Sequence, residues 1–158
     1  MLPLKKIVCP TDFSEPAYKG LKIAAELCAE FSAELLLVHV VSPLPTMPGG
    51  IGPAGFQFPT VLDEIQETAR NSLEEIRREK IAADVRVRTV VKYGSPAHEI
   101  VKLAESETAD MIVISSHGES GWHRFVFGSV AEKVVRHAEC PVLTIRASKE
   151  DSQVSAEP

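Results

Sequence analysis

The chain has 158 residues, of which 44% are hydrophobic and 25% charged, and its mean hydropathy is +0.02. This composition predicts one soluble globular domain and excludes a fibrous, disordered or two-domain chain. The net charge of −5 and the pI of about 5.6 argue against a nucleic-acid partner and an anionic membrane surface. No apolar run approaches the ~18 residues that a membrane span needs.

The first ten residues, MLPLKKIVCP, have neither the long apolar stretch nor the small-residue cleavage site of a signal peptide. The three cysteines are odd in number and far apart, which argues against a disulfide framework and a Cys-x-x-Cys zinc site. The five histidines form no His-x-x-x-His or Cys/His ligand set. We therefore expect a cytoplasmic protein without a built-in metal site, in which the cysteines are small buried hydrophobic residues.

Five apolar, β-rich runs alternate with four segments of helical periodicity. The strands are predicted at 5–9, 34–41, 85–91, 111–115 and 142–145. The first helix is expected after Ser14, the second after Thr60 and the third at Pro96, while Ser129 and Glu132 have the spacing of a capping box for the fourth. Strict alternation requires crossover connections between parallel strands. The sequence therefore predicts a single-domain α/β fold with a doubly wound, five-stranded parallel sheet and four helices.

Two of the five strands have the character of edges. Residues 85–91 alternate between polar and apolar, which suits an edge strand, whereas 142–145 are apolar and follow Pro141. A bare apolar edge pairs readily with another chain, so we expect a homodimer through the strand 142–145. The alternative is a monomer in which this strand is internal.

Two segments fall outside the alternating pattern. Residues 42–59 hold five prolines and four glycines and are expected to form a flexible surface loop. The polar tail, 147–158, is expected to be disordered.

Two loops that follow strands carry the candidate chemistry. Residues 10–14 follow the first strand, and residues 115–129 follow the fourth; they face each other if these two strands are neighbours. In the second loop, glycines allow close backbone approach, and Gly128 and Ser129 lead into a helix N-terminus with unpartnered N–H groups. This arrangement is typical of a phosphate site. In the alternative interpretation, the glycines only form turns and Ser129 only caps the helix.

Several pieces of the sequence resemble the universal stress protein family, in its nucleotide-binding branch. They are PTDFS at 10–14, HVV at 39–41, SSHG at 115–118, GS at 128–129 and VAEKVVRHAECPVLTI at 130–145. The pieces occur in the family's order, and the resemblance covers residues 5–146. It implies a Rossmann-like fold of the adenine nucleotide alpha-hydrolase type, with one universal stress protein domain at 1–146.

ATP-binding members of this family have the signature Gly-x-x-Gly, nine residues, then Gly-Ser or Gly-Thr. In this chain, Ser115 stands at the first glycine position, and Gly118, Gly128 and Ser129 stand at the others. The resemblance implies ATP, or AMP or ADP, as a regulatory ligand in the stress response. Either Arg124 or a divalent metal, expected to be Mg²⁺, would have to offset the charge of a triphosphate.

The resemblance also assigns roles within the expected site. Asp12 and Val40 would line its nucleoside side, and the backbone N–H groups of Ser129 and Val130 would meet the phosphates. Gly94 is expected as a further wall of the cleft, and Arg124 is the one cation of the glycine-rich loop. The full set of expected nucleotide-contacting residues is Pro10, Thr11, Asp12, Val40, Gly94, Ser115, His117, Gly118, Gly121, Arg124, Gly128, Ser129 and Val130.

Two other classes of function stay open at this point. The chain could be a slow ATPase or phosphotransferase, with Asp12 orienting a metal and His117 or Ser129 near the γ-phosphate. It could also be a nucleotide-free dimeric interaction module in which Ser115 closes the pocket. No residue has the character of a strong catalytic base, and an aspartate before a helix often only forms a turn.

Other nucleotide-binding and catalytic motifs are either absent or lack the strand and helix that they require around them. The run GIGPAG at 50–55 has the letters of a dinucleotide fingerprint, but it contains a proline and neither follows a strand directly nor opens a helix. No Walker A motif or hydrolase elbow is present. A receiver-type phosphoacceptor site would need acids beside Asp12 and after the third strand, and neither position supplies one.

Overall fold

The computed structural model describes residues 3–43, 58–116 and 128–146, with the side chains of 58–60 excepted. The expected loop (apart from its ends), the tail, and His117, Gly118, Gly121 and Arg124 lie outside the described residues. Within these described residues, nine elements alternate: β1 (Lys6–Pro10), α1 (Glu15–Phe31), β2 (Glu34–Val41), α2 (Phe58–Lys80), β3 (Arg86–Tyr93), α3 (Pro96–Ser106), β4 (Met111–Ser115), α4 (Ser129–His137) and β5 (Val142–Ile145).

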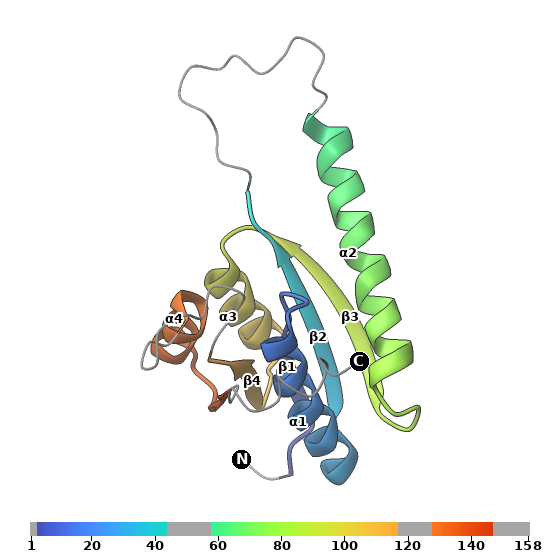
Figure 1. The fold of residues 1–158 in the computed structure, drawn as a ribbon. Helices are drawn as coiled ribbons and strands as arrows, with labels where there is room; N and C mark the ends of the chain where they lie inside the picture. Colours follow the sequence, from blue (N-terminus) through green and yellow to red (C-terminus); the bar gives the residue numbers. More distant parts are fainter. Residues whose placement is uncertain (1–2, 44–57, 117–127, 147–158) are drawn as a thin grey trace, which may run out of the picture.

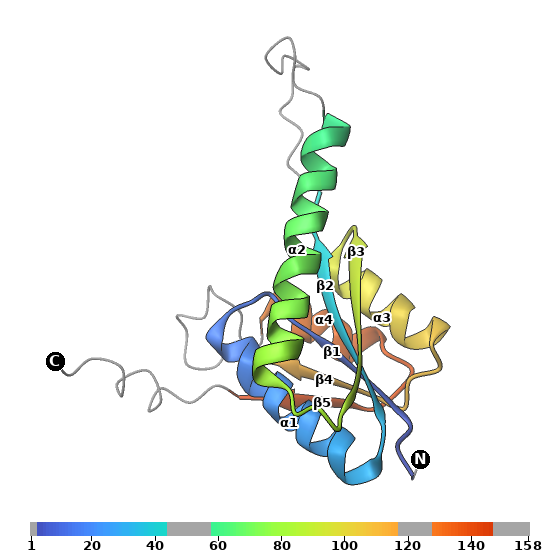
Figure 2. The same ribbon diagram turned by 90° about the vertical axis from the view of Figure 1, so that its right-hand side faces the viewer.

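The five strands form one parallel sheet in the order β3-β2-β1-β4-β5 (Figure 1, with β5 labelled in Figure 2). One apolar cluster joins α1 and α2 to one face of the sheet and includes Leu35 and Leu37 of β2. A second joins α3 and α4 to the opposite face, through Leu36 and Val38. This three-layer arrangement confirms the predicted doubly wound α/β fold (Figure 2).

The predicted edges are confirmed, because β3 and β5 are the outer strands of the sheet. The alternative with an internal last strand is wrong. The predicted bounds of β2, β4 and β5 agree with the structure, and β1 and β3 are displaced by one or two residues.

Two helix starts differ from the prediction. Helix α2 begins at Phe58 rather than after Thr60, because Pro59 falls in the first turn, where no backbone N–H is needed. The capping box at Ser129 is wrong: the N-cap of α4 is Gly128, whose carbonyl accepts the first helical bond from the Glu132 N–H at 3.0 Å. The Gly128 N–H donates to Ser116 O at 2.6 Å, which fixes the start of the helix one residue earlier.

Helix α1 lies against the carboxyl end of β4 at Gly20. A β-carbon built on Gly20 would lie 3.4 Å from the backbone nitrogen of Ser115, so this position has room for little more than a methyl group. The close approach holds the first helix against the strand that ends at Ser115.

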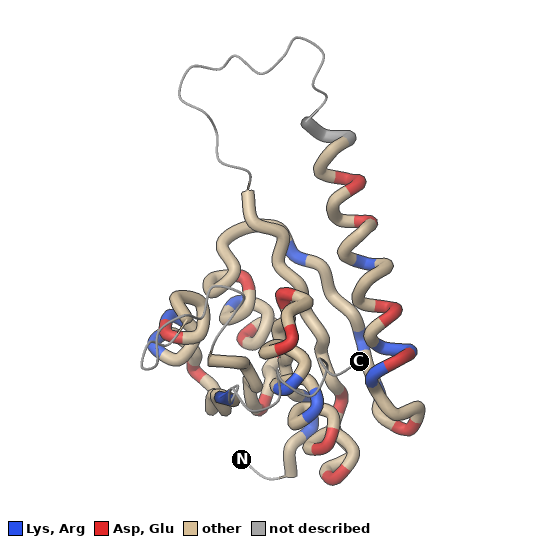
Figure 3. The backbone as a smooth tube through the Cα atoms, in the orientation of Figure 1, with Lys and Arg blue, Asp and Glu red and all other residues tan. Residues whose placement is uncertain are grey.

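Helix α2 is the longest of the described helices and carries charges of both signs along its length (Figure 3). Within the described ranges, no helix combines the length and apolar character that a membrane crossing requires.

A network of charges ties together the amino ends of the first three strands. Arg88 of β3 donates two hydrogen bonds to Glu107, at 2.9 and 2.7 Å, and Lys6 of β1 donates a third at 2.9 Å. Glu34 of β2 accepts from Arg88 Nε at 3.4 Å. The bonds from Arg88, and then those from Lys6, lower the pKa of Glu107 to about 2.

We expect the Glu107→Gln variant to lose part of its stability at pH 7 and to respond less to acid than the unmodified protein. The folded pKa of Glu107 lies below its ordinary value, so its contribution is present above about pH 4.5 and is lost as the pH falls toward 2. Arg88 is 45% exposed, so solvent screening limits the effect to about 1–2 kcal/mol. Urea unfolding at pH 7, 4 and 3 measures it.

The matched control is Glu67→Gln, which removes an exposed ion pair with Arg70 on α2. We expect a change below about 0.5 kcal/mol at every pH for this variant. Equal pH dependence of the Glu107 variant and the unmodified protein would contradict the assigned role of the network.

Candidate functional site

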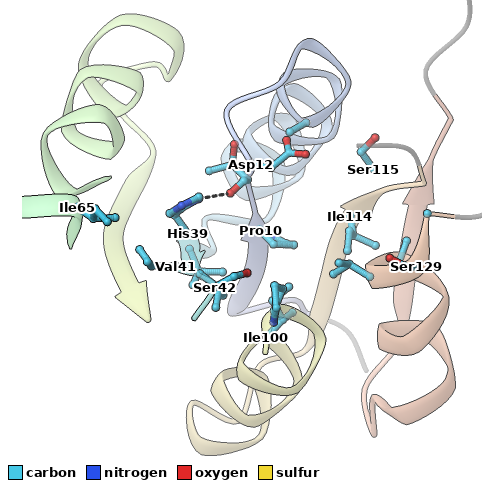
Figure 4. A pocket seen from close by; sticks show the side chains of 18 residues that line it. Pro10, Asp12, His39, Val41, Ser42, Ile65, Ile100, Ile114, Ser115 and Ser129 are labelled. Atoms are coloured by element: carbon cyan, nitrogen blue, oxygen red, sulfur yellow. Dashed lines mark hydrogen bonds between the residues drawn. The ribbon is translucent and has the colours of Figure 1, made fainter. Parts of the chain in front are cut away.

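A pocket of about 590 Å³ lies over the carboxyl ends of β1, β2 and β4 (Figure 4). The sheet order places β1 between β2 and β4, and the helices that follow β1 and β4 pack on opposite faces of the sheet. This is the topological switch point at which open α/β sheets bind ligands. Its lining residues are Pro10, Thr11, Asp12, Ala17, Val38, His39, Val40, Val41, Ser42, Ile65, Pro96, Ile100, Ile114, Ser115, Gly128, Ser129, Val130 and Ala131.

The turn between β1 and α1 forms one wall and is held by its own side chains. Ser14 donates to Asp12 Oδ1 from its backbone N–H at 3.1 Å and from its hydroxyl at 2.5 Å. The Ser14 hydroxyl oxygen also accepts from the Ala17 N–H, as an N-cap does. These bonds leave Asp12 Oδ2 for a donor from the pocket, because Asp12 is exposed and lines it.

The start of α4 forms the opposite wall. The N-cap Gly128 offers no side chain to cap the helix. The N–H groups of Ser129, Val130 and Ala131 precede the first intrahelical bond, and all three residues line the pocket. The amino end of a helix dipole therefore opens into the hollow, which is the arrangement that binds anions.

The described lining of the pocket carries little side-chain charge. Among the described lining residues, Asp12 is the one acid, and none is Lys or Arg. The attraction for an anion therefore comes from backbone amides in this part of the chain. The described residues contain no cluster of three or more His, Cys, Asp or Glu side chains that could hold a metal ion.

Eight of the thirteen expected residues meet in this pocket: Pro10, Thr11, Asp12, Val40, Ser115, Gly128, Ser129 and Val130. Their contact with a nucleotide stays a prediction. Gly94 is not among the lining residues; its N–H donates to Val41 O at 3.0 Å, and Pro96, two residues later, lines the pocket in its place.

Ser115 does not close the pocket. It is one of the residues that line the hollow (Figure 4). The non-glycine residues with positive φ in the described ranges are Phe13, Ser32 and Thr108, so Ser115 has an ordinary backbone conformation. A serine at this position of the signature is therefore accommodated without left-handed strain.

Of the residues compared next, the sequence singled out Val40 for the site but not His39, Val41, Ile65, Ile100 or Ile114. His39, Val41 and Ile65 lie on the sheet face that α1 and α2 cover, whereas Val40, Ile100 and Ile114 lie on the other face. The pocket reaches both faces because it sits above the strand ends. The alternation of side chains along β2 could have predicted which face of the sheet each of its residues lies on. No signal in the sequence predicts that α2 lies where Ile65 reaches the pocket.

The cysteines lie away from this chemistry. Burial raises the pKa of both Cys9 and Cys28 to about 12, and neither lines the pocket. Cys140 is half-buried, and burial raises its pKa as well. The prediction of buried cysteines is confirmed for the first two.

Comparison with known proteins agrees with this fold and pocket. A sequence model of the universal stress protein family matches residues 3–146. The chain belongs to the universal stress protein family. This universal stress protein domain is 35% identical over 147 residues to universal stress protein MJ0531 of Methanocaldococcus jannaschii, with 93% of this chain and 85% of that protein covered.

Two further universal stress proteins have solved structures. MJ0577 of the same organism is 33% identical over 153 residues, covering 90% of this chain and 94% of that protein. Its solved structure has a TM-score of 0.78 at 32% identity, covering 92% of this chain and 98% of that chain. A universal stress protein of Archaeoglobus fulgidus, solved in complex with dAMP, has a TM-score of 0.59 at 26% identity, covering 92% of this chain and 99% of that one.

Proposed function

We propose that this universal stress protein binds ATP, or AMP or ADP, as a regulatory ligand in the cytoplasmic stress response. The observation that carries the proposal is the open N-terminus of α4, which faces Asp12 across one pocket. Three consecutive N–H groups at Ser129, Val130 and Ala131 are available for phosphate oxygens. Hydrogen bonds to charged oxygens contribute about 1.5–3 kcal/mol each, so a few of them support micromolar binding.

The choice of this helix rests on a comparison with the two other helices that begin beside the pocket. At α1, the hydroxyl of Ser14 already accepts from the Ala17 N–H. At α3, Pro96 removes a donor and Glu99 adds negative charge to the first turn. Glu132 of α4 is instead paired with Arg136 at 2.8 Å. The phosphates therefore belong at α4.

The nucleoside belongs at the opposite wall. Apolar side chains of β2 and α3 surround that part of the pocket, and Asp12 supplies a hydrogen-bond acceptor for a ribose hydroxyl or a base amine. The relative from Archaeoglobus fulgidus, solved in complex with dAMP, supports an adenine nucleotide as the ligand.

Magnesium is part of the proposal because of the charge balance. A triphosphate brings several negative charges into a pocket whose described lining contains Asp12 and no Lys or Arg. Mg²⁺ keeps several of its waters when it binds the phosphates of a substrate. Because Asp12 is assigned to the nucleoside, Mg²⁺ would be held at α4 by the phosphate oxygens and its own waters, and it would supply the charge that offsets the phosphates.

The decisive experiment has two parts. Small molecules released from freshly purified, denatured protein are identified by mass spectrometry, and the emptied protein is then titrated with ATP by calorimetry, with and without Mg²⁺. We expect an adenine nucleotide in the released fraction and micromolar binding that Mg²⁺ strengthens. Neither heat of binding nor a thermal shift with ATP and Mg²⁺ would instead favour a nucleotide-free interaction module.

We also propose that the protein is a homodimer joined through β5. This strand is an outer edge of the sheet, its four residues are each half-buried, and Val135 of the adjacent α4 is 48% exposed. Backbone groups of successive residues in a strand point to alternate sides. The carbonyls of Pro141 and Ile145 accept from β4, so Val142 and Thr144 direct their N–H groups outward. Pairing with a second β5 would satisfy them.

A further inference from the structure

We infer that His39 is a positioning residue that holds the carboxylate of Asp12 toward the nucleoside end of the pocket. The inference rests on the proposed nucleotide function and adds a residue to it. His39 is half-buried near the end of β2 and lines the pocket, on the sheet face that α1 and α2 cover (Figure 4). Asp12 lies in a different segment, the turn between β1 and α1.

His39 contacts the residue before Asp12 through a hydrogen bond. Its Nδ1 lies 2.8 Å from the carbonyl oxygen of Thr11. A carbonyl oxygen only accepts hydrogen bonds, so Nδ1 carries the proton and donates. Thr11 is itself buried, and its N–H donates to Val38 O at 2.9 Å. The turn is therefore attached to β2 through both the backbone N–H and the backbone carbonyl of Thr11.

His39 also contacts the residue after Asp12, through its ring. The ring of Phe13 lies against that of His39, with 4.4 Å between the ring centroids and 34° between the planes. Phe13 has φ of +67°, a left-handed conformation that residues with a β-carbon rarely adopt. The ring contact and the bond from the Phe13 N–H to Thr11 Oγ1 at 3.0 Å hold the residue in this conformation.

Asp12 thus lies between two residues that are both held by one side chain. Its Oδ1 accepts two bonds from Ser14, which fixes the rotation of the carboxylate and leaves Oδ2 for a ligand. If His39 is removed, the Thr11 carbonyl and the Phe13 ring lose their contacts with β2, and the bond from the Thr11 N–H to Val38 O is the attachment that stays. Asp12 then spends part of its time turned away from the pocket, and the nucleoside loses its acceptor.

The alternative is a purely structural histidine, whose loss lowers stability without changing ligand preference. A pair of probes separates the two roles. Magnesium ATP engages both walls of the pocket, whereas magnesium tripolyphosphate has the phosphates without the nucleoside and engages the wall at α4 alone. A positioning role changes the affinity for the first probe and not for the second.

Three substitutions remove different parts of His39. His39→Phe keeps a ring against Phe13 but has no donor for Thr11 O. His39→Gln places its amide near the position of Nε2 and also cannot replace the Nδ1 bond, so it serves if the phenylalanine variant does not fold. His39→Asn can donate from its Nδ2 atom near the position of Nδ1. The matched control is His98→Phe, at an exposed histidine of α3 outside the pocket lining.

For His39→Phe and His39→Gln we expect ATP affinity to fall about five- to tenfold, while tripolyphosphate affinity changes less than about twofold. His39→Asn is expected to restore ATP affinity to within about threefold of the unmodified protein. Unfolding by urea is measured for every variant, so that a change in stability is separated from a change in ligand preference.

A double-mutant cycle with Asp12→Ala tests whether His39 acts through Asp12. We expect His39→Phe to have no further effect on ATP affinity once Asp12 is absent. The inference is overturned if the histidine variants bind ATP as the unmodified protein does, if they lose both probes equally, or if the loss persists in the Asp12→Ala background. Failure of the unmodified protein to bind ATP overturns the proposed function itself, and the inference with it.

Discussion

Replacing Gly128 by valine is expected to weaken ATP binding by about 100-fold or more, because the new side chain occupies the place where phosphate oxygens meet the start of α4. Gly128 has φ of −57° and ψ of 143°, a conformation that any residue adopts, so the glycine is not required by its backbone angles. The protein should therefore fold, with a loss of about 1 kcal/mol from an unfavourable N-cap residue. Calorimetric titration with magnesium ATP and with magnesium tripolyphosphate measures the effect, and both affinities should fall.

Ser95→Val is the matched control for this substitution. Ser95 is the N-cap of α3, makes no capping bond with its side chain and does not line the pocket. The variant therefore places a valine at a comparable helix start and should leave both affinities near those of the unmodified protein. If Gly128→Val binds ATP normally, the phosphates do not lie at α4 and the proposed orientation of the nucleotide is wrong.

Replacing Thr144 by proline is expected to convert the protein from a dimer to a monomer. Proline removes the outward N–H of Thr144 and obstructs the pairing of a second strand, but takes no hydrogen bond from the pairing of β5 with β4. Sedimentation equilibrium should give twice the chain mass of 17.2 kDa for the unmodified protein and the chain mass for the variant.

The control for this experiment is Thr89→Pro, on the opposite edge of the sheet. Gly94 donates its N–H to β2, so alternation along β3 directs the N–H of Thr89 away from the sheet. This variant also loses the Thr89–Glu74 hydrogen bond at 2.6 Å, and it should remain a dimer. A dimeric Thr144→Pro variant, or a monomeric unmodified protein, would place the self-association elsewhere or exclude it.

The sequence could predict those parts of the candidate site that depend on neighbouring residues. Asp12 follows a strand and precedes a helix, and Gly128 precedes another helix, so both were expected at one edge of the sheet. The sequence left open whether Ser115 belongs to a nucleotide site or closes the pocket, because local sequence does not place the end of β4 relative to the start of α4. In the structure, Ser115 lines the pocket and has an ordinary backbone conformation. The contact between His39 and Thr11 spans 28 positions and has no local signal.

The start of α4 shows the same limit. Ser129 and Glu132 have the spacing of a capping box, and a local pattern cannot distinguish that motif from a helix whose N-cap lies one residue earlier. The hydrogen bond from Gly128 to Ser116 decides the matter, because it joins the helix start to the end of β4. Gly94 was expected as a wall of the pocket, but the start of α3 lines the pocket rather than the turn before it. A local pattern could not distinguish these two positions.

The sequence by itself determined the number, type and approximate bounds of the strands and helices, and with them the parallel sheet, because hydrophobic periodicity and helix caps are properties of neighbouring residues. Only the tertiary structure decided the strand order, the face that each helix covers, and the residues that share the pocket. These depend on crossover connections that bring distant segments together, and their energy lies in side-chain packing and hydrogen bonds between residues far apart in the chain.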